Sequence, residues 1–137
     1  MHLLRIGLVV ALAATAMFVG LDSARAQASN DGRGDVRVAG RCSGTATSKL
    51  RLRARDGGLE LEFELEHSRP RALWRVAVVH ERRVVWRGTR RASVTGAAFE
   101  LARPLPDLPG TDAVTVTAWG PSGATCRATA TLRATSG

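Results

Sequence analysis

Residues 49–66 alternate strictly between apolar and charged side chains, in two limbs that a glycine turn separates. In the first limb leucine and alanine alternate with arginine, and in the second leucine and phenylalanine alternate with glutamate. A period of two is typical of a strand with one buried face, and Asp56-Gly57-Gly58 tolerates the positive φ of a tight turn. The pattern predicts a β-hairpin with an apolar inner face and a charged outer face.

One register of this hairpin satisfies both of its faces. It has the facing pairs Ala54 and Leu61, Leu52 and Phe63, Leu50 and Leu65, Arg55 and Glu60, Arg53 and Glu62, Arg51 and Glu64, and Lys49 and Glu66. A slip of one residue would turn the charges into the core. Cross-strand charge pairs stabilise by only about 0.2–1 kcal/mol each, so we interpret them as fixing the register and not as a binding site.

Further segments with strand composition follow at short intervals. They are residues 35–42, 72–80, 83–88, 97–103, 113–119 and 124–132. Glu81-Arg82 and the GPSG segment at 120–123 predict turns, and PLPDLPGTD at 104–112 predicts a connection, because proline excludes a helix there. Trp74 shares a face with Val76 and Val78 and is predicted to be core, whereas the Val-Val-Trp run leaves the burial of Trp86 open.

These elements predict the fold class. About seven to eight short antiparallel strands, without a convincing helix, predict an all-β, two-sheet sandwich with immunoglobulin-like architecture. A small closed barrel is the alternative layout.

The N-terminus predicts export. Arg5 precedes an apolar run at residues 6–19, and small residues follow that suit cleavage after Ala26 or Ala28. The run is shorter than the roughly 20 residues that span a bilayer. We therefore expect a signal peptide (1–26), a flexible lead-in (27–34), one domain (35–133) and a tail (134–137), in a secreted or envelope-associated monomer without a membrane anchor.

The two cysteines are consistent with export. Cys42 and Cys126 are the only cysteines of the chain, and a lone pair in an oxidising compartment is most simply a disulfide. The loop that it closes would stabilise the fold by about 4.5 kcal/mol in the chain-entropy model. A reactive or metal-binding pair is the alternative, but neither a CxxC spacing nor a neighbouring histidine supports it.

Three segments carry a resemblance: RCSGTATSKLRLRARDGG, LWRVAVVHERRVVWRGTR and PGTDAVTVTAWGPSGATCRATATL. Over about residues 41–132 the chain resembles small secreted proteins of high-GC Gram-positive bacteria, mostly of unassigned function. The resemblance implies a secreted β-sandwich with one disulfide, and it implies no catalytic residues.

Residue types that carry catalysis or bind metals are sparse. His67 and His80 belong to no HxH, HExxH or CxxH pattern, and we interpret both as hydrated residues next to turns. The glutamates from Glu60 to Glu66 lie opposite arginines and not in a cleft. Without a GxSxG motif or a phosphate-binding loop, the sequence predicts no enzyme, cofactor or metal.

The distribution of charge is uneven. Of the 20 basic and 12 acidic residues, two and one precede Gln27, so the remaining chain has a net charge of +7. Residues 69–91 alone hold this excess, because they contain one acid, Glu81, and eight arginines: Arg69, Arg71, Arg75, Arg82, Arg83, Arg87, Arg90 and Arg91. This hairpin is either a hydrated basic face or a surface for polyanions.

Two functional hypotheses follow from these observations. In the first, the protein is a secreted, non-catalytic binding or envelope-associated module whose arginines meet an anionic envelope polymer or an acidic protein, without specific nucleic-acid recognition. In the second, it is an inhibitor-like or structural protein that docks the proline-rich segment at residues 103–112 on a partner, where prolines lower the ordering cost of binding.

Overall fold

The computed structural model describes residues 29–30 and 34–133. The predicted signal peptide and tail, and most of the predicted lead-in, lie outside the described residues. The strands are β1 (Ser29–Asn30), β2 (Asp35–Ala39), β3 (Arg41–Cys42), β4 (Thr47–Arg55), β5 (Gly58–Glu66), β6 (Leu73–His80), β7 (Arg83–Arg91), β8 (Phe99–Pro106), β9 (Thr111–Trp119) and β10 (Thr125–Arg133). The only helical element in this described part is a 3-10 turn, η1 (Pro121–Gly123).

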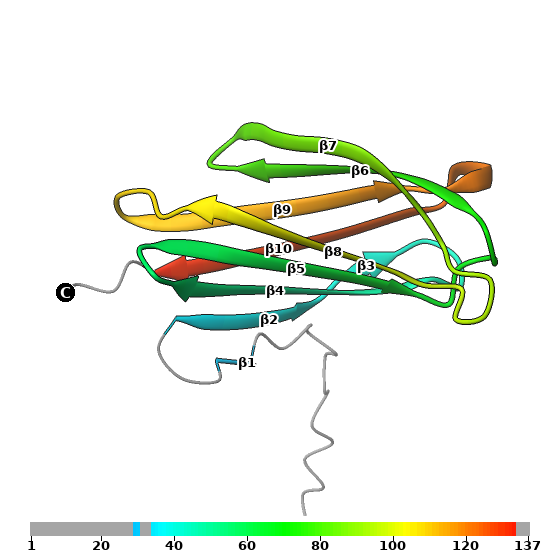
Figure 1. Cartoon of the computed structure of the whole chain (residues 1–137), viewed down its shortest axis with the longest axis horizontal. Coiled ribbons are helices and arrows are strands. Elements are labelled where there is room, and N and C mark those ends of the chain that lie inside the picture. Colours follow the sequence, from blue (N-terminus) through cyan, green and yellow to red (C-terminus); the bar gives the residue numbers. More distant parts are fainter. Residues whose placement is uncertain (1–28, 31–33, 134–137) are drawn as a thin grey trace, which may run out of the picture.

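The strands form two antiparallel sheets (Figure 1), which we call sheet A, with the order β1-β2-β4-β5-β8, and sheet B, with the order β3-β10-β9-β6-β7. The predicted all-β, two-sheet sandwich is therefore confirmed. The finer expectation of immunoglobulin-like architecture stays a prediction.

The core lies between the sheets, where alternate residues of both sheets meet. Sheet A contributes mainly leucine and phenylalanine, and sheet B contributes mainly valine and alanine. Trp74 is core as predicted, with 2% of its surface exposed, and its indole N–H donates to Ser68 Oγ at 2.8 Å. Gly120 permits this packing, because a Cβ at that position would lie 2.7 Å from the indole.

The predicted register of the β4–β5 hairpin is wrong by two residues. Leu52 faces Leu61 and not Phe63, and Arg53 faces Glu60 and not Glu62. A slip of two residues keeps every side chain on its face, so the alternating pattern cannot distinguish the two registers. The turn decides between them: Asp56 and Gly57 have φ of +40° and +79°, which makes a two-residue turn of the kind whose twist matches the strands.

The predicted proline-rich connection is shorter than the sequence suggested. β8 continues through Pro106, so residues 104–106 lie in a strand, and only residues 107–110 connect β8 to β9. β8 is an edge strand of sheet A. A proline cannot donate a ladder hydrogen bond, but an edge strand has one side without a partner strand and therefore accommodates it.

A β-bulge explains why the Val-Val-Trp run has no readable period. The register between β6 and β7 shifts between Val78 and Val79, so that Trp86 faces Val78 and Val84 faces Val79. Val85 is the extra residue of the bulge. Trp86 consequently lies on the inner side of β7 and is half-buried against the core.

The predicted disulfide between Cys42 and Cys126 is present. The two residues are direct cross-strand partners on β3 and β10, so the bridge joins the beginning of the sandwich to its last strand across 84 positions of sequence.

The short strand β1 pairs with β2, and Ser29 and Asn30 of the predicted lead-in are therefore in strand conformation.

Candidate functional site

The outer faces of the two sheets differ in charge. The strands of sheet A contain six acidic and six basic residues, whereas those of sheet B contain eight arginines and one acid, Asp112. Asp112 is 1% exposed and faces the core. Nearly all of the net positive charge of the described chain is therefore carried by one layer.

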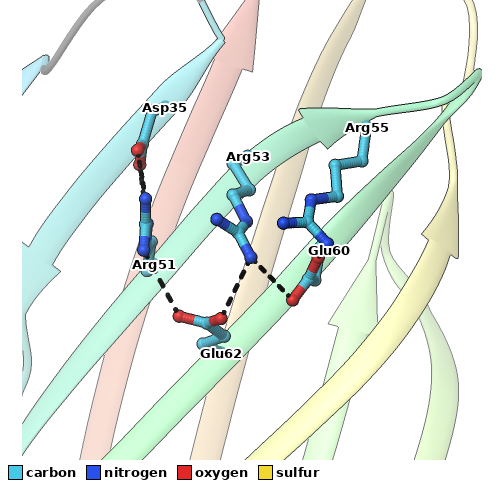
Figure 2. Close-up of polar contacts among 6 residues, drawn as sticks. All are labelled: Asp35, Arg51, Arg53, Arg55, Glu60 and Glu62. Carbon is cyan, nitrogen blue, oxygen red and sulfur yellow. Dashed lines mark hydrogen bonds and ion pairs between the residues drawn. The ribbon is translucent and has the colours of Figure 1, made fainter.

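On sheet A the charges neutralise one another in a row across β2, β4 and β5 (Figure 2). Arg51 donates to Asp35 through both Nε and Nη2, at 3.1 and 2.6 Å. Arg53 Nη2 lies 3.0 Å from a carboxylate oxygen of Glu60 and 3.4 Å from one of Glu62. The pairs Arg53–Glu62 and Arg55–Glu60, predicted as direct partners, exist here as diagonal contacts.

The pKa shifts on sheet A follow from these contacts. Hydrogen bonds from Arg51 hold the pKa of Asp35 below its ordinary value, and Arg53 lowers the pKa of Glu60 in the same way. Glu64 faces Glu100 on β8, and the neighbouring Glu100 carboxyl group, together with burial, raises the pKa of Glu64. We call the outer side of sheet A the self-paired face, because the three arginines of β4 contact carboxylates of β2 and β5 and the acidic and basic residues of its strands are equal in number.

The outer face of sheet B has the opposite character. Residues that pair directly across antiparallel strands project to the same side of a sheet, and the observed registers bring six arginines to the outer side. They are Arg41, Arg75, Arg87, Arg91, Arg127 and Arg133. We call this surface the basic face. The strands that form it present no acidic side chain on this side within the described residues.

Threonines occupy most of the remaining positions of the basic face. They are Thr89, Thr111, Thr115, Thr117, Thr125, Thr129 and Thr131. Thr115 and Thr129 share a hydrogen bond of 2.8 Å between their hydroxyl groups. A hydroxyl both donates and accepts, so these rows set neutral hydrogen-bonding groups between the guanidinium groups.

A hollow of about 490 Å³ lies on the basic face, over the middle of β6. Ala77 forms its floor, and its direct partners are Arg87 on β7 and Thr117 on β9. Trp119, 39% exposed, stands at its side, with the Arg75 guanidinium 6.0 Å from the ring centroid. The hollow exists because a small alanine lies among longer side chains.

Seven of the eight arginines predicted as a polyanion surface divide among three places. Arg75, Arg87 and Arg91 lie on the basic face. Arg69 and Arg71 are exposed in the loop before β6, where the Arg71 carbonyl accepts from Arg91 Nη1 at 2.9 Å. Arg82 and Arg83 are exposed at the β6–β7 turn. The sequence window missed Arg41, Arg127 and Arg133, which distant strands contribute.

Arg90, the eighth, belongs to a different structure. Its guanidinium lies 5.0 Å from the centroid of Trp86, and that of Arg103 on β8 lies 5.4 Å from the same ring. Both cations lie at cation–π distance from the indole, and through Arg103 this contact joins the edge strand β8 of sheet A to the edge strand β7 of sheet B. Gly88 leaves room for it, because a Cβ there would lie 2.5 Å from the ring.

The interpretation of His80 as a hydrated turn residue is wrong. His80 is 2% exposed, and its Nε2 lies 2.7 Å from Asp112 Oδ1. Both residues share the parity of the buried positions on their strands, which is the sequence signal that could have revealed the pair. His67, in contrast, is exposed beside its turn, and its Nδ1 lies 3.0 Å from Thr47 Oγ1.

The two carboxylates of the cluster around His80 already accept hydrogen bonds from backbone groups of the protein. Ligand atoms of His80, Glu81 and Asp112 lie within 4.8 Å of one another. However, Glu81 Oε1 accepts from the Ala113 N–H at 2.7 Å, and Asp112 Oδ1 accepts from the Leu108 N–H at 3.2 Å. The contact with Asp112, and then burial, raises the pKa of Asp107. These bonds connect the β6–β7 turn and the β8–β9 loop to the first residues of β9, at the left end of Figure 1. We call this cluster the clasp, because it holds these segments together.

Comparison with known proteins identifies no relative. The sequence matches no protein-family model, and neither a curated protein nor a solved structure is significantly similar to it. Among the described residues, no helix is long and apolar enough to cross a membrane.

Proposed function

We propose that the protein is a secreted, non-catalytic module that binds polyanions through the basic face of sheet B. The observation that carries the proposal is the contrast between the two sheets: the same fold pairs its charges on sheet A and leaves six arginines without an acid on the outer face of sheet B. Unopposed charge of one sign on an extended surface attracts and orients a polyanion.

Export is supported by two independent features. The first is the predicted signal peptide at the N-terminus, and the second is the Cys42–Cys126 bridge, because disulfides persist in oxidising compartments. A secreted basic surface would meet anionic polymers of the cell envelope or medium. The alternative, a docking proline-rich loop, has less support, because Pro104 and Pro106 lie in β8.

Two triple variants test the proposal. Replacing Arg75, Arg87 and Arg127 by glutamine is expected to weaken binding to a sulfated polysaccharide by about 10- to 100-fold at about 0.1 M salt, because exposed charge contacts contribute up to about 1 kcal/mol each. For a linear polyanion, the slope of log affinity against log salt should also fall by about 2 to 3. Affinity chromatography and titration over a range of salt concentrations measure both quantities.

The matched control replaces Arg51, Arg53 and Arg55 by glutamine. It removes the same net charge from the self-paired face, so we expect a loss of less than about threefold, since distant exposed charges are screened within about 10 Å at 0.1 M salt. Equal losses from both triple variants would contradict the proposal, as would no retention of the natural protein at near-physiological salt.

A further inference from the structure

The hollow beside Trp119 has a distinct combination of groups. All three tryptophans of the chain are described. Trp74 is 2% exposed, and Trp86 is half-buried against the core with two guanidinium groups at its ring. Trp119 is the most exposed of the three, at 39%, and it lies at the side of a hollow. A single exposed aromatic residue needs no explanation by itself, so the inference depends on what surrounds it.

Two guanidinium groups border this hollow. Arg75 lies beside Trp119, and Arg87 lies on the next strand, opposite Ala77. A guanidinium has paired N–H donors that match a carboxylate in a bidentate arrangement. Because the neighbouring positions on the face carry no acid, neither guanidinium is paired with a carboxylate of the outer face itself.

One hydroxyl residue, Thr89, lines the hollow, and it is the direct partner of Arg75 across β6 and β7. Thr125 is the direct partner of Trp119 on the neighbouring strand β10. Threonine hydroxyls hydrogen-bond neutral hydroxyls as donors and as acceptors, whereas a polymer of phosphates needs only cations. A flat indole can pack against the apolar face of a sugar ring, while polar groups around the indole bind the polar edge of that sugar.

We infer that this hollow binds a sugar ring that carries a carboxylate, so that the polyanion of the basic face is an acidic polysaccharide. The inference rests on the proposed function. The indole stacks on the C–H face of the sugar ring, Arg75 and Arg87 bind its carboxylate, and Thr89 binds one of its hydroxyl groups. Single-stranded nucleic acid fits less well, because it stacks successive bases on several aromatic side chains, and this face presents one.

The test compares Trp119→Ala with the natural protein on four probes: polygalacturonate, polyphosphate of similar charge, oligo(dT) and neutral dextran. We expect Trp119→Ala to weaken polygalacturonate binding at least tenfold and polyphosphate binding less than twofold. Trp119→Phe retains a ring and should recover much of the loss. The site is on the surface, so circular dichroism should show an unchanged fold for both variants, and dextran should not bind.

The outcomes separate this inference from the proposed function. Equal loss for polygalacturonate and polyphosphate, or no loss for either, overturns the acidic-sugar site and leaves polyanion binding intact. Tighter binding of oligo(dT) that depends on Trp119 overturns the inference in favour of nucleic acid. If the natural protein binds none of the three polyanions, both the inference and the proposed function are wrong.

Discussion

Replacing Cys42 and Cys126 together by alanine is expected to lower the free energy of unfolding by about 2–4.5 kcal/mol. The bridge spans 84 positions, so its loss restores much conformational freedom to the unfolded chain. Denaturant unfolding of the double variant and of the oxidised protein gives the difference directly. Reductant should destabilise the natural protein by a similar amount and leave the double variant unchanged.

An unchanged unfolding midpoint in the double variant would contradict this expectation. It would mean that the pairing of β3 with β10, and the packing of the sandwich behind it, already hold the beginning of the domain in place. Alanine is the preferred replacement because Cys126 is fully buried, and a serine hydroxyl there would require a hydrogen-bond partner.

Replacing Asp112 by alanine is expected to destabilise the protein by about 3 kcal/mol or more, because the change leaves buried polar groups without a partner. His80 would lose its bond at Nε2, and its Nδ1 already has no partner among the described residues. The Leu108 N–H would lose its acceptor as well. Thermal and denaturant unfolding measure the change.

Two further variants make this result specific. Asp112→Asn keeps an oxygen that can accept these bonds, so it should cost clearly less than Asp112→Ala. Glu100→Ala removes an exposed acid from β8 and should change stability by no more than about 0.5 kcal/mol. If Asp112→Ala proved as mild as Glu100→Ala, the clasp would not contribute to the stability of the fold.

The alternating pattern predicts which face of each strand is buried and says less about which residues become partners. For the β4–β5 hairpin the faces are right and the register is off by two residues, because every slip of two is equivalent to the pattern. The two-residue turn at Asp56 and Gly57 removes that degeneracy. Arginines face glutamates in both registers, so the opposite charges of the two strands do not indicate which register forms.

The alternation of buried and exposed positions also indicates that His80 is buried, which we did not predict. His80 follows Trp74, Val76 and Val78 on the inner face of β6, but its position next to a turn suggested exposure. A polar residue on a buried parity should have prompted a search for its partner, and Asp112 lies on the corresponding parity of β9. Which histidine nitrogen meets which carboxylate depends on the packing of the sheets and cannot be read from sequence.

The basic face was only partly visible in the sequence. A local window shows the arginines of β6 and β7, but the face also needs Arg41 from β3 and Arg127 and Arg133 from β10. Long-range pairing joins β3 to β10 and β10 to β9, and β9 in turn pairs with β6. Trp119 joins the same surface because β9 lies between β6 and β10, and no nearby residue in sequence indicates that position.

The most direct test of polyanion binding by the basic face is to map a bound polyanion on the protein. Titration of a short sulfated or carboxylated oligosaccharide into the isotope-labelled protein, followed by NMR, reports chemical-shift changes of each backbone amide. We expect the largest changes on β6, β7, β9 and β10 around Ala77 and Trp119, and we expect them to diminish as salt is raised. Changes centred on β4 and β5, or no changes at low salt, would contradict it.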